Sequence, residues 1–156
     1  MDDPVRQFSE LRRVAVVGVS RRWRWKIGRV LFDALRREGY EVLPVNPHAQ
    51  SIAGVPCFAD LRSIAPPPEG VLVAVPAKAA LEAVRQCHEL GIARVWLVGG
   101  AASAEVLEFC ARHGLRAAYG SCPVQWLAPR SLHWLHRKLS ELFRRGPRVV
   151  APDMQR

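Results

Sequence analysis

The chain has 156 residues, of which 49% are hydrophobic and 24% charged, so it is expected to form one globular domain rather than a disordered chain. Its 23 Lys and Arg against 14 Asp and Glu give a formal net charge of +9, which favours an anionic partner. Nucleic acid, a membrane surface and phosphorylated cofactors all remain open at this point. The apolar runs are too short to span a bilayer and the first residues do not resemble a secretion signal, so a cytoplasmic protein is expected.

The positive charge is concentrated at the two ends of the chain. Residues 49–129 hold 6 basic and 6 acidic residues, whereas residues 1–48 hold 10 and 6, and residues 130–156 hold 7 and 2. Within the first segment the charge gathers in a run that contains no acid: Arg21, Arg22, Arg24, Lys26 and Arg29.

From residue 13 onward, short apolar runs alternate with amphipathic stretches. Strands are predicted at residues 14–19, 41–45, 70–75, 94–98 and 115–119, and helices at residues 27–38, 78–90 and 103–114. Residues 48–69 are mostly a connection, with one helical turn expected at residues 60–64. This alternation predicts an α/β fold: a three-layer, Rossmann-like, doubly wound parallel sheet of about five strands.

The pattern changes after residue 129, so the sequence divides into a domain at residues 1–129 and a C-terminal segment at residues 130–156. A basic amphipathic helix is predicted at about residues 132–144, and the tail from residue 148 is expected to be frayed. The helix is interpreted as docked by its apolar stripe, with contact to a partner or a membrane as the alternative. The same stripe could close a homodimer.

No metal site and no catalytic site is predicted. The four cysteines Cys57, Cys87, Cys110 and Cys122 form no CxxC pair and are expected to be reduced, mostly buried thiols. The five histidines are scattered over separate elements, and no serine or cysteine lies in a nucleophile elbow.

Ligands of an open parallel sheet bind outside the carboxyl ends of the strands, so the loops that follow the predicted strands are the candidate site. The first loop is the most informative, because Gly18 permits a tight turn, Ser20 offers a hydroxyl, and the helix after it presents free N–H groups. With the arginines beside it, this loop suits a diphosphate. Trp23 and Trp25 are interpreted either as a cover for a base or apolar arm, or as residues packed on neighbouring surface.

The sequence argues against a standard dinucleotide site. The G-x-G-x-x-G fingerprint is reduced to its first glycine in the run from Gly18 to Trp23, and Asn46 stands where an acid would bond the ribose diol. NAD is therefore disfavoured, and NADP less so because arginines are nearby. No Walker phosphate loop occurs.

The loops after the predicted strands contain an ordered set of short motifs: Gly18-Val-Ser20, Val45-Asn-Pro47, Gly54-Val-Pro-Cys57, Val75-Pro76 and Ser121-Cys-Pro123. Together these motifs resemble the CoA-binding domain family, and a similar domain begins the alpha subunit of succinyl-CoA synthetase. The resemblance covers about residues 10–128 and implies a Rossmann-like domain that binds coenzyme A or acyl-CoA without catalysis. It implies a diphosphate near residues 18–28 and an adenosine near Asn46, Pro47, Val75 and Pro76.

The complete candidate cofactor site consists of residues at the strand ends and the first loop: Gly18, Val19, Ser20, Arg21, Arg22, Lys26, Gly28, Asn46, Pro47, Val75, Pro76, Gly99, Cys122 and Pro123. Cys122 is interpreted as a structural thiol, with a mixed disulfide to a bound thiol as the alternative. The alternative functions are an NADP-linked or other nucleotide-dependent oxidoreductase and a nucleic-acid binder that uses both basic ends. Nucleic acid is the less favoured partner.

Overall fold

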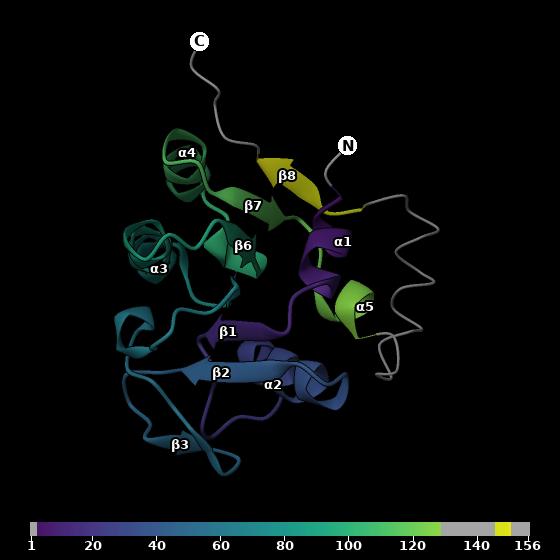
Figure 1. The fold of residues 1–156 in the computed structure, drawn as a ribbon, viewed down its shortest axis with the longest axis vertical. Coiled ribbons are helices and arrows are strands. Elements are labelled where there is room, and N and C mark those ends of the chain that lie inside the picture. Colours follow the sequence, from purple (N-terminus) through teal and green to yellow (C-terminus); the bar gives the residue numbers. More distant parts are fainter. Residues whose placement is uncertain (1–2, 129–145, 151–156) are drawn as a thin grey trace.

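A computed structural model describes residues 3–128 and 146–150, and a six-stranded sheet forms its centre (Figure 1). The strand order is β2-β1-β5-β6-β7-β8. The strands are β1 (Arg13–Val17), β2 (Glu41–Val45), β5 (Gly70–Val73), β6 (Arg94–Leu97), β7 (Arg116–Tyr119) and β8 (Arg148–Val150). Neighbouring strands pair in parallel from β2 to β7, and β8 alone pairs antiparallel, with β7.

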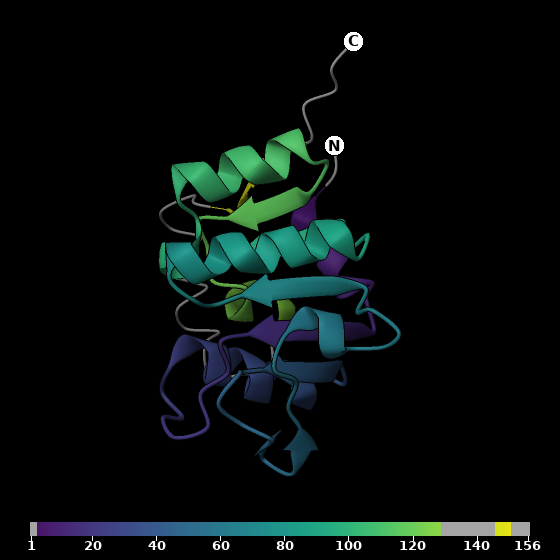
Figure 2. The same cartoon turned by 90° about the vertical axis from the view of Figure 1, so that its left-hand side faces the viewer.

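Helices cover both faces of the sheet, which confirms the predicted three-layer Rossmann-like class (Figures 1 and 2). One face carries α1 (Pro4–Ser9), α2 (Ile27–Arg37) and α5 (Val124–Leu127). The other carries α3 (Ala77–Glu89), α4 (Ala104–Arg112) and the 3-10 turn η1 (Leu61–Ser63). The small hairpin of β3 (Ser51–Ile52) and β4 (Val55–Pro56) and the turn η2 (Gly99–Ala101) lie in the connections. Among the described residues, no helix is long and apolar enough to cross a bilayer.

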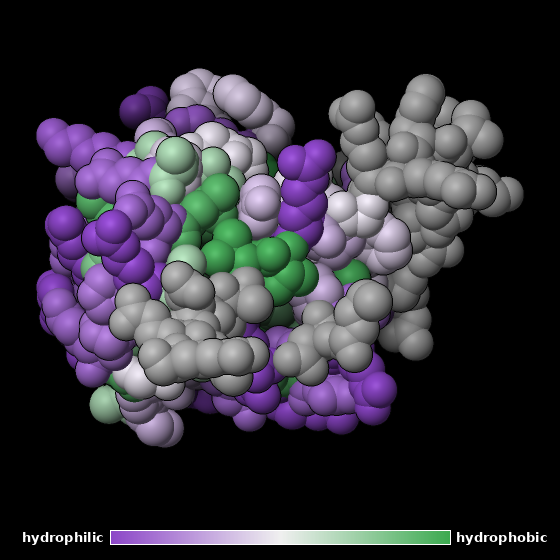
Figure 3. Space-filling view, turned by 90° about the horizontal axis from the view of Figure 1, so that it is seen from above, coloured by the Kyte–Doolittle hydropathy of each residue, from purple (hydrophilic) through white to green (hydrophobic). Residues whose placement is uncertain are grey.

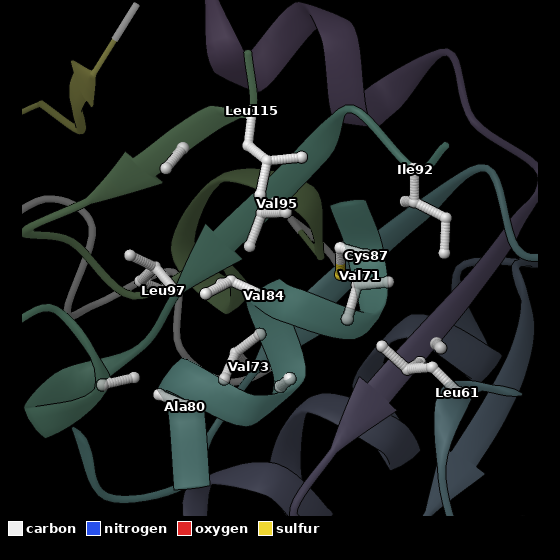
Figure 4. Close-up of a cluster of buried hydrophobic side chains, with 14 of the residues drawn as sticks. Leu61, Val71, Val73, Ala80, Val84, Cys87, Ile92, Val95, Leu97 and Leu115 are labelled. Atoms are coloured by element: carbon white, nitrogen blue, oxygen red, sulfur yellow. The ribbon is translucent and has the colours of Figure 1, made fainter. Parts of the chain in front are cut away.

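Alternation along the buried strands divides the apolar side chains between two cores. In β5, Val71 and Val73 face α3 and α4, whereas Leu72 between them faces α1 and α2. Figure 4 shows the first core, in which Val71 and Val73 lie with Val84 of α3. Because every parallel strand is covered on both faces, each reads in the sequence as a continuous apolar run.

The cysteine thiols of Cys87 and Cys110 are part of the first core. Both residues are fully buried, and burial raises the pKa of each thiol, to about 12 for Cys110. These two thiols therefore remain protonated and pack as small apolar groups, as predicted.

The three helices predicted at residues 27–38, 78–90 and 103–114 are confirmed within a residue or two at their ends. Ser103 accepts a hydrogen bond from the Val106 N–H at 3.3 Å and begins α4. No helix is predicted before residue 13, yet α1 begins at Pro4, where the Asp3 side chain accepts a hydrogen bond from the Val5 N–H at 3.0 Å. The helical turn expected at residues 60–64 is confirmed as η1.

The prediction of a frayed tail is wrong at residues 148–150. These residues form β8, in which Val150 stands opposite Ala117 of β7, so the chain returns to the edge of the sheet. Val149 of this edge strand is 41% exposed. The surface at this end of the molecule is mostly hydrophilic around a central apolar patch (Figure 3). The predicted basic helix at residues 132–144 lies outside the described residues.

Two tryptophans of contrasting burial test how the core stabilises this fold. Trp96 is fully buried and packs edge-on against Phe8, with 5.4 Å between the two ring centroids, whereas Trp25 is 73% exposed. We expect Trp96→Ala to lower the free energy of unfolding by about 3–5 kcal/mol, because it removes a large buried side chain. Trp25→Ala should change it by less than about 0.5 kcal/mol. Urea denaturation followed by far-UV circular dichroism measures both, and equal losses would contradict this assignment of the core.

Candidate ligand-binding pocket

The topology opens a pocket where the strand order reverses. The chain leaves β1 through α2 to β2 on one side, and then passes through the hairpin and η1 to β5 on the other side of β1. The connections therefore diverge at the carboxyl ends of β1 and β5, where ligands of open α/β sheets bind. A pocket of about 480 Å³ lies there, lined by Val17, Gly18, Val19, Ser20, Lys26, Val45, Asn46, Pro47, Ala59, Asp60, Leu61, Val75, Ala79, Glu82, Ala83 and Gln86.

Two glycines bring α2 directly against the loop that follows β1. Gly18 has a φ of +97°, and a Cβ on it would stand 2.5 Å from the Ala74 carbonyl oxygen. A Cβ on Gly28, in the first turn of α2, would overlap the carbonyl oxygen of Gly18. In the dinucleotide fingerprint a late glycine allows this close approach of helix and strand. Here Gly28 performs that role at a spacing the fingerprint does not contain.

The amino end of α2 supplies positive potential at one end of the pocket. Its N-cap is Lys26, which lines the pocket and whose side chain makes no capping hydrogen bond. The Arg29 and Val30 N–H groups donate to the Lys26 carbonyl at 2.9 and 3.0 Å. The helix dipole and the ammonium group together favour an anion at this end.

Asn46 ties the loop after β1 to the loop after β2. Its side-chain N–H donates to the Val19 carbonyl at 2.9 Å, and its Oδ1 accepts from the His48 N–H at 2.8 Å. The Arg21 guanidinium adds a second link by donating to the His48 carbonyl at 2.8 Å. Asn46 and Arg21 are therefore positioning residues of the pocket mouth.

Ser20 shapes the start of the same loop. Its Oγ accepts from the Trp23 N–H at 2.9 Å, which closes a tight turn and leaves the hydroxyl hydrogen able to donate. The buried residue Arg29 pairs through its guanidinium with Asp33 at 3.1 Å and reaches the Ser20 carbonyl at 3.5 Å. The loop is therefore bonded to a partly buried ion pair of α2.

The opposite wall of the pocket comes from α3 and η1. Ala79 and Ala83 are small and leave space, while buried Gln86 accepts from the Leu61 N–H at 2.9 Å and donates to Glu82 at 3.1 Å. These bonds hold η1 against α3. No residue of this wall is among those predicted from the sequence, although small and polar residues recur at four-residue spacing on the helix after β5 and indicate one shared face.

Two carboxylates make this far end of the pocket acidic. Asp60 accepts hydrogen bonds from the Ser63 hydroxyl and N–H at 2.6 and 2.9 Å, and these bonds lower the pKa of its carboxyl group. Glu82 pairs with Arg62 at 3.2 Å. The pocket therefore has the ammonium group of Lys26 at the α2 end and two carboxylates at the η1 end, where Arg62 pairs with Glu82.

The structure brings part of the sequence-predicted site into the pocket. The predicted residues that line it are Gly18, Val19, Ser20, Lys26, Asn46, Pro47 and Val75. The predicted residues that do not line it are Arg21, Arg22, Gly28, Pro76, Gly99, Cys122 and Pro123.

Cys122 lies just before α5, partly buried against the core on the α2 face. Burial raises the pKa of its thiol, although the Val124 and Gln125 N–H groups oppose the shift. A raised pKa lowers the thiolate fraction near neutral pH, which favours the structural interpretation over a mixed disulfide.

The fold and pocket define an open, mostly parallel α/β domain of the Rossmann-like class, with a ligand pocket at the switch in strand order. Within that class, the chain belongs to the CoA binding domain family, whose model matches residues 12–126. This finding confirms the resemblance drawn from the sequence.

Two curated relatives are acetate–CoA ligases (ADP-forming) of Archaeoglobus fulgidus. Form II is 30% identical over 120 residues, and the match covers 67% of this chain and 17% of the ligase. Form I is 27% identical over 119 residues, covering 70% of this chain and 17% of the ligase. The chain therefore spans only about a sixth of the length of these relatives.

Solved structures show the same fold. A conserved hypothetical protein from Pyrococcus furiosus is 32% identical with a TM-score of 0.67, over 71% of this chain and 95% of that one. The apo dinucleotide-forming acetyl-coenzyme A synthetase 1 of Ca. Korarchaeum cryptofilum matches at 24% identity and a TM-score of 0.57, over 67% of this chain and 25% of that one. The second match bears on the fold alone.

The contact between Gly18 and Gly28 can be tested by adding one methyl group. Gly28→Ala should lower the free energy of unfolding by about 1–3 kcal/mol, because the methyl group meets backbone that must shift. Gly100→Ala is the matched control, since nothing lies within 4 Å of the added methyl group. Thermal unfolding of both variants measures the difference, and an unchanged melting temperature for Gly28→Ala would contradict the close approach of α2.

Proposed function

We propose that this chain binds coenzyme A or an acyl-CoA in the pocket between β1 and β5 and contributes binding rather than catalysis. The observation that carries the proposal is the placement on the pocket wall of Lys26, the N-cap residue of α2, whose side chain makes no capping hydrogen bond. Membership of the CoA binding domain family supports the identity of the ligand.

The polarity of the pocket suggests how such a ligand would be oriented. A diphosphate fits the end formed by Lys26, Ser20 and α2, where an ammonium, a hydroxyl and a helix dipole favour negative charge. The carboxylates of Asp60 and Glu82 would repel phosphate and instead accept hydrogen bonds from neutral donors such as hydroxyl and amino groups. Asn46, Pro47 and Val75 then lie beside the adenosine, as the family resemblance implies.

The polar groups on the pocket wall are bonded to the protein rather than arranged as a nucleophile with a base. The Ser20 Oγ accepts from the Trp23 N–H, Asp60 accepts from Ser63, and Glu82 pairs with Arg62, while none of the described lining residues is a histidine or a cysteine. The pocket volume of about 480 Å³ lies within the range usual for small-molecule sites. The activities of the much longer ligases are not needed to explain this pocket.

The oxidoreductase alternative gains nothing from the structure. Asn46 occupies the position from which an acid would hold the adenosine ribose of NAD, and both polar ends of its side chain already bond to the protein, at Val19 and His48. Asn46 could bond a ribose only by giving up one of these two hydrogen bonds, and the link between the two loops would then be lost.

Isothermal titration calorimetry against CoA, acetyl-CoA, NADPH and ATP tests the proposed ligand. We expect CoA or acetyl-CoA to release heat and to raise the melting temperature, because a ligand that binds only the folded state stabilises it. NADPH and ATP should bind more weakly. Heat from NADPH with none from CoA would overturn the proposal in favour of the nucleotide-dependent alternative.

A charge-matched pair of variants tests where the phosphates bind. Lys26→Ala should weaken CoA binding by about tenfold, since it removes a charge-assisted contact at the anion end. Arg36→Ala removes the same charge from the exposed carboxyl end of α2 and should leave the affinity unchanged. Equal affinities of the two variants in calorimetry would move the phosphate site away from α2.

A further inference from the structure

The loop between β1 and α2 exposes apolar side chains that the pocket does not use. We call residues 21–27 the Trp–Arg loop, and all seven of these residues are exposed. Of the four large hydrophobic residues exposed in the described part of the chain, the loop holds three: Trp23 at 47%, Trp25 at 73% and Ile27 at 38%. Figure 2 shows this loop projecting beyond the sheet on the side where the parallel strands end.

Cations alternate with these apolar residues. The run reads Arg21, Arg22, Trp23, Arg24, Trp25, Lys26, Ile27 and contains no acid. Lys26 alone of the seven lines the pocket, and Arg21 donates to the His48 carbonyl. Arg22 and Arg24 form no ion pair with any described carboxylate. Their charge is therefore not explained by the pocket or by the rest of the described chain.

The two indoles form one apolar knob rather than an open stacking platform. The rings of Trp23 and Trp25 are 6.1 Å apart at 48° to each other, and the Arg22 guanidinium lies 5.8 Å from the Trp23 ring centre. The tilted rings offer no pair of parallel faces between which a base would stack, and the Arg22 guanidinium occupies part of the Trp23 ring. This geometry disfavours single-stranded nucleic acid, which is held by aromatic faces open to successive bases.

We propose that the Trp–Arg loop is a docking surface for an anionic lipid bilayer. Indoles settle at the headgroup level of a bilayer because their apolar ring is buried while the N–H stays hydrated. Arg22 and Arg24 would lie at the lipid phosphates, where each basic residue strengthens attachment by about fivefold. One short loop gives weak, reversible and salt-sensitive attachment, in contrast to a membrane-spanning helix.

Co-sedimentation with vesicles tests the proposal on the whole chain. Vesicles of phosphatidylcholine mixed with phosphatidylglycerol should retain the protein, and vesicles of phosphatidylcholine alone should retain much less. The double variant Trp23→Ser and Trp25→Ser keeps the net charge, and we expect it to lose at least about tenfold in binding to the anionic vesicles. The capping bond from the Trp23 N–H to Ser20 is a backbone contact and is kept in this variant.

A second pair of variants separates the loop from the overall charge of the protein. Arg22→Ser with Arg24→Ser and Arg36→Ser with Arg37→Ser each remove two exposed cations, so the two proteins carry equal net charge. The first pair should weaken vesicle binding by at least about tenfold and the second by much less. Equal losses would overturn the proposal and assign any binding to unspecific attraction by the basic chain.

Two further outcomes would overturn it. Binding of a thymidine oligonucleotide that the Trp23→Ser and Trp25→Ser variant abolishes, with no binding to vesicles, would assign the loop to nucleic acid. Tryptophan fluorescence that neither shifts to the blue nor gains protection from iodide on anionic vesicles would show that the indoles stay in water. Because Trp23 and Trp25 do not line the pocket, calorimetry with CoA tests the proposed function independently of these results.

Discussion

The close contact of Gly28 with the carbonyl of Gly18 is the constraint on which the site depends. Without a Cβ at either position, the amino end of α2 lies directly against the turn that leaves β1. The helix dipole, Lys26 and the turn at Ser20 consequently meet at one end of a single pocket. A side chain at Gly28 would push the helix away from the loop, and Lys26 and the amino end of α2 would then no longer lie beside Ser20.

The sequence predicts the part of this fold that is set by burial. The five parallel strands are apolar runs because helices cover both faces, and the helices show their buried stripes and caps, as at Ser103. It does not predict β8, since three residues that pair with a strand about 30 positions earlier carry no local signal. The helix α1 is not predicted because its 6 residues are too few to show a helical period, although Asp3 and Pro4 mark its start.

The candidate site likewise has a part that the sequence predicts and a part that depends on tertiary contacts. Gly18, Ser20, Lys26 and Asn46 follow strands directly, so the rule that ligands bind at strand ends places them at the pocket. The four-residue spacing of small and polar residues marks one face of α3, but the bond from the Leu61 N–H to Gln86 that places η1 beside this face joins residues 25 positions apart and has no local signal. Nor can a sequence say which basic residues of an irregular loop turn inward, since such a loop has no repeating period.

The basic residues near the amino end of the chain lie in different places and make different contacts. Lys26 lines the pocket, Arg21 links the two loops, Arg29 is buried and pairs with Asp33, and Arg22 and Arg24 lie outside the pocket. A single anionic ligand in the pocket therefore accounts for only a part of the basic cluster. The remainder is available to a second anionic surface on the outer side of the same loop.

The bonds of Asn46 and Arg21 have a consequence for motion. Because they join the loops after β1 and β2 at two points, a fluctuation that lifts one loop must break bonds to the other. The two loops therefore belong to one cooperative unit of local opening, distinct from the strands beneath them. A ligand held by the first loop would slow amide exchange in the second as well, so occupancy of the pocket is transmitted to residues that need not contact the ligand.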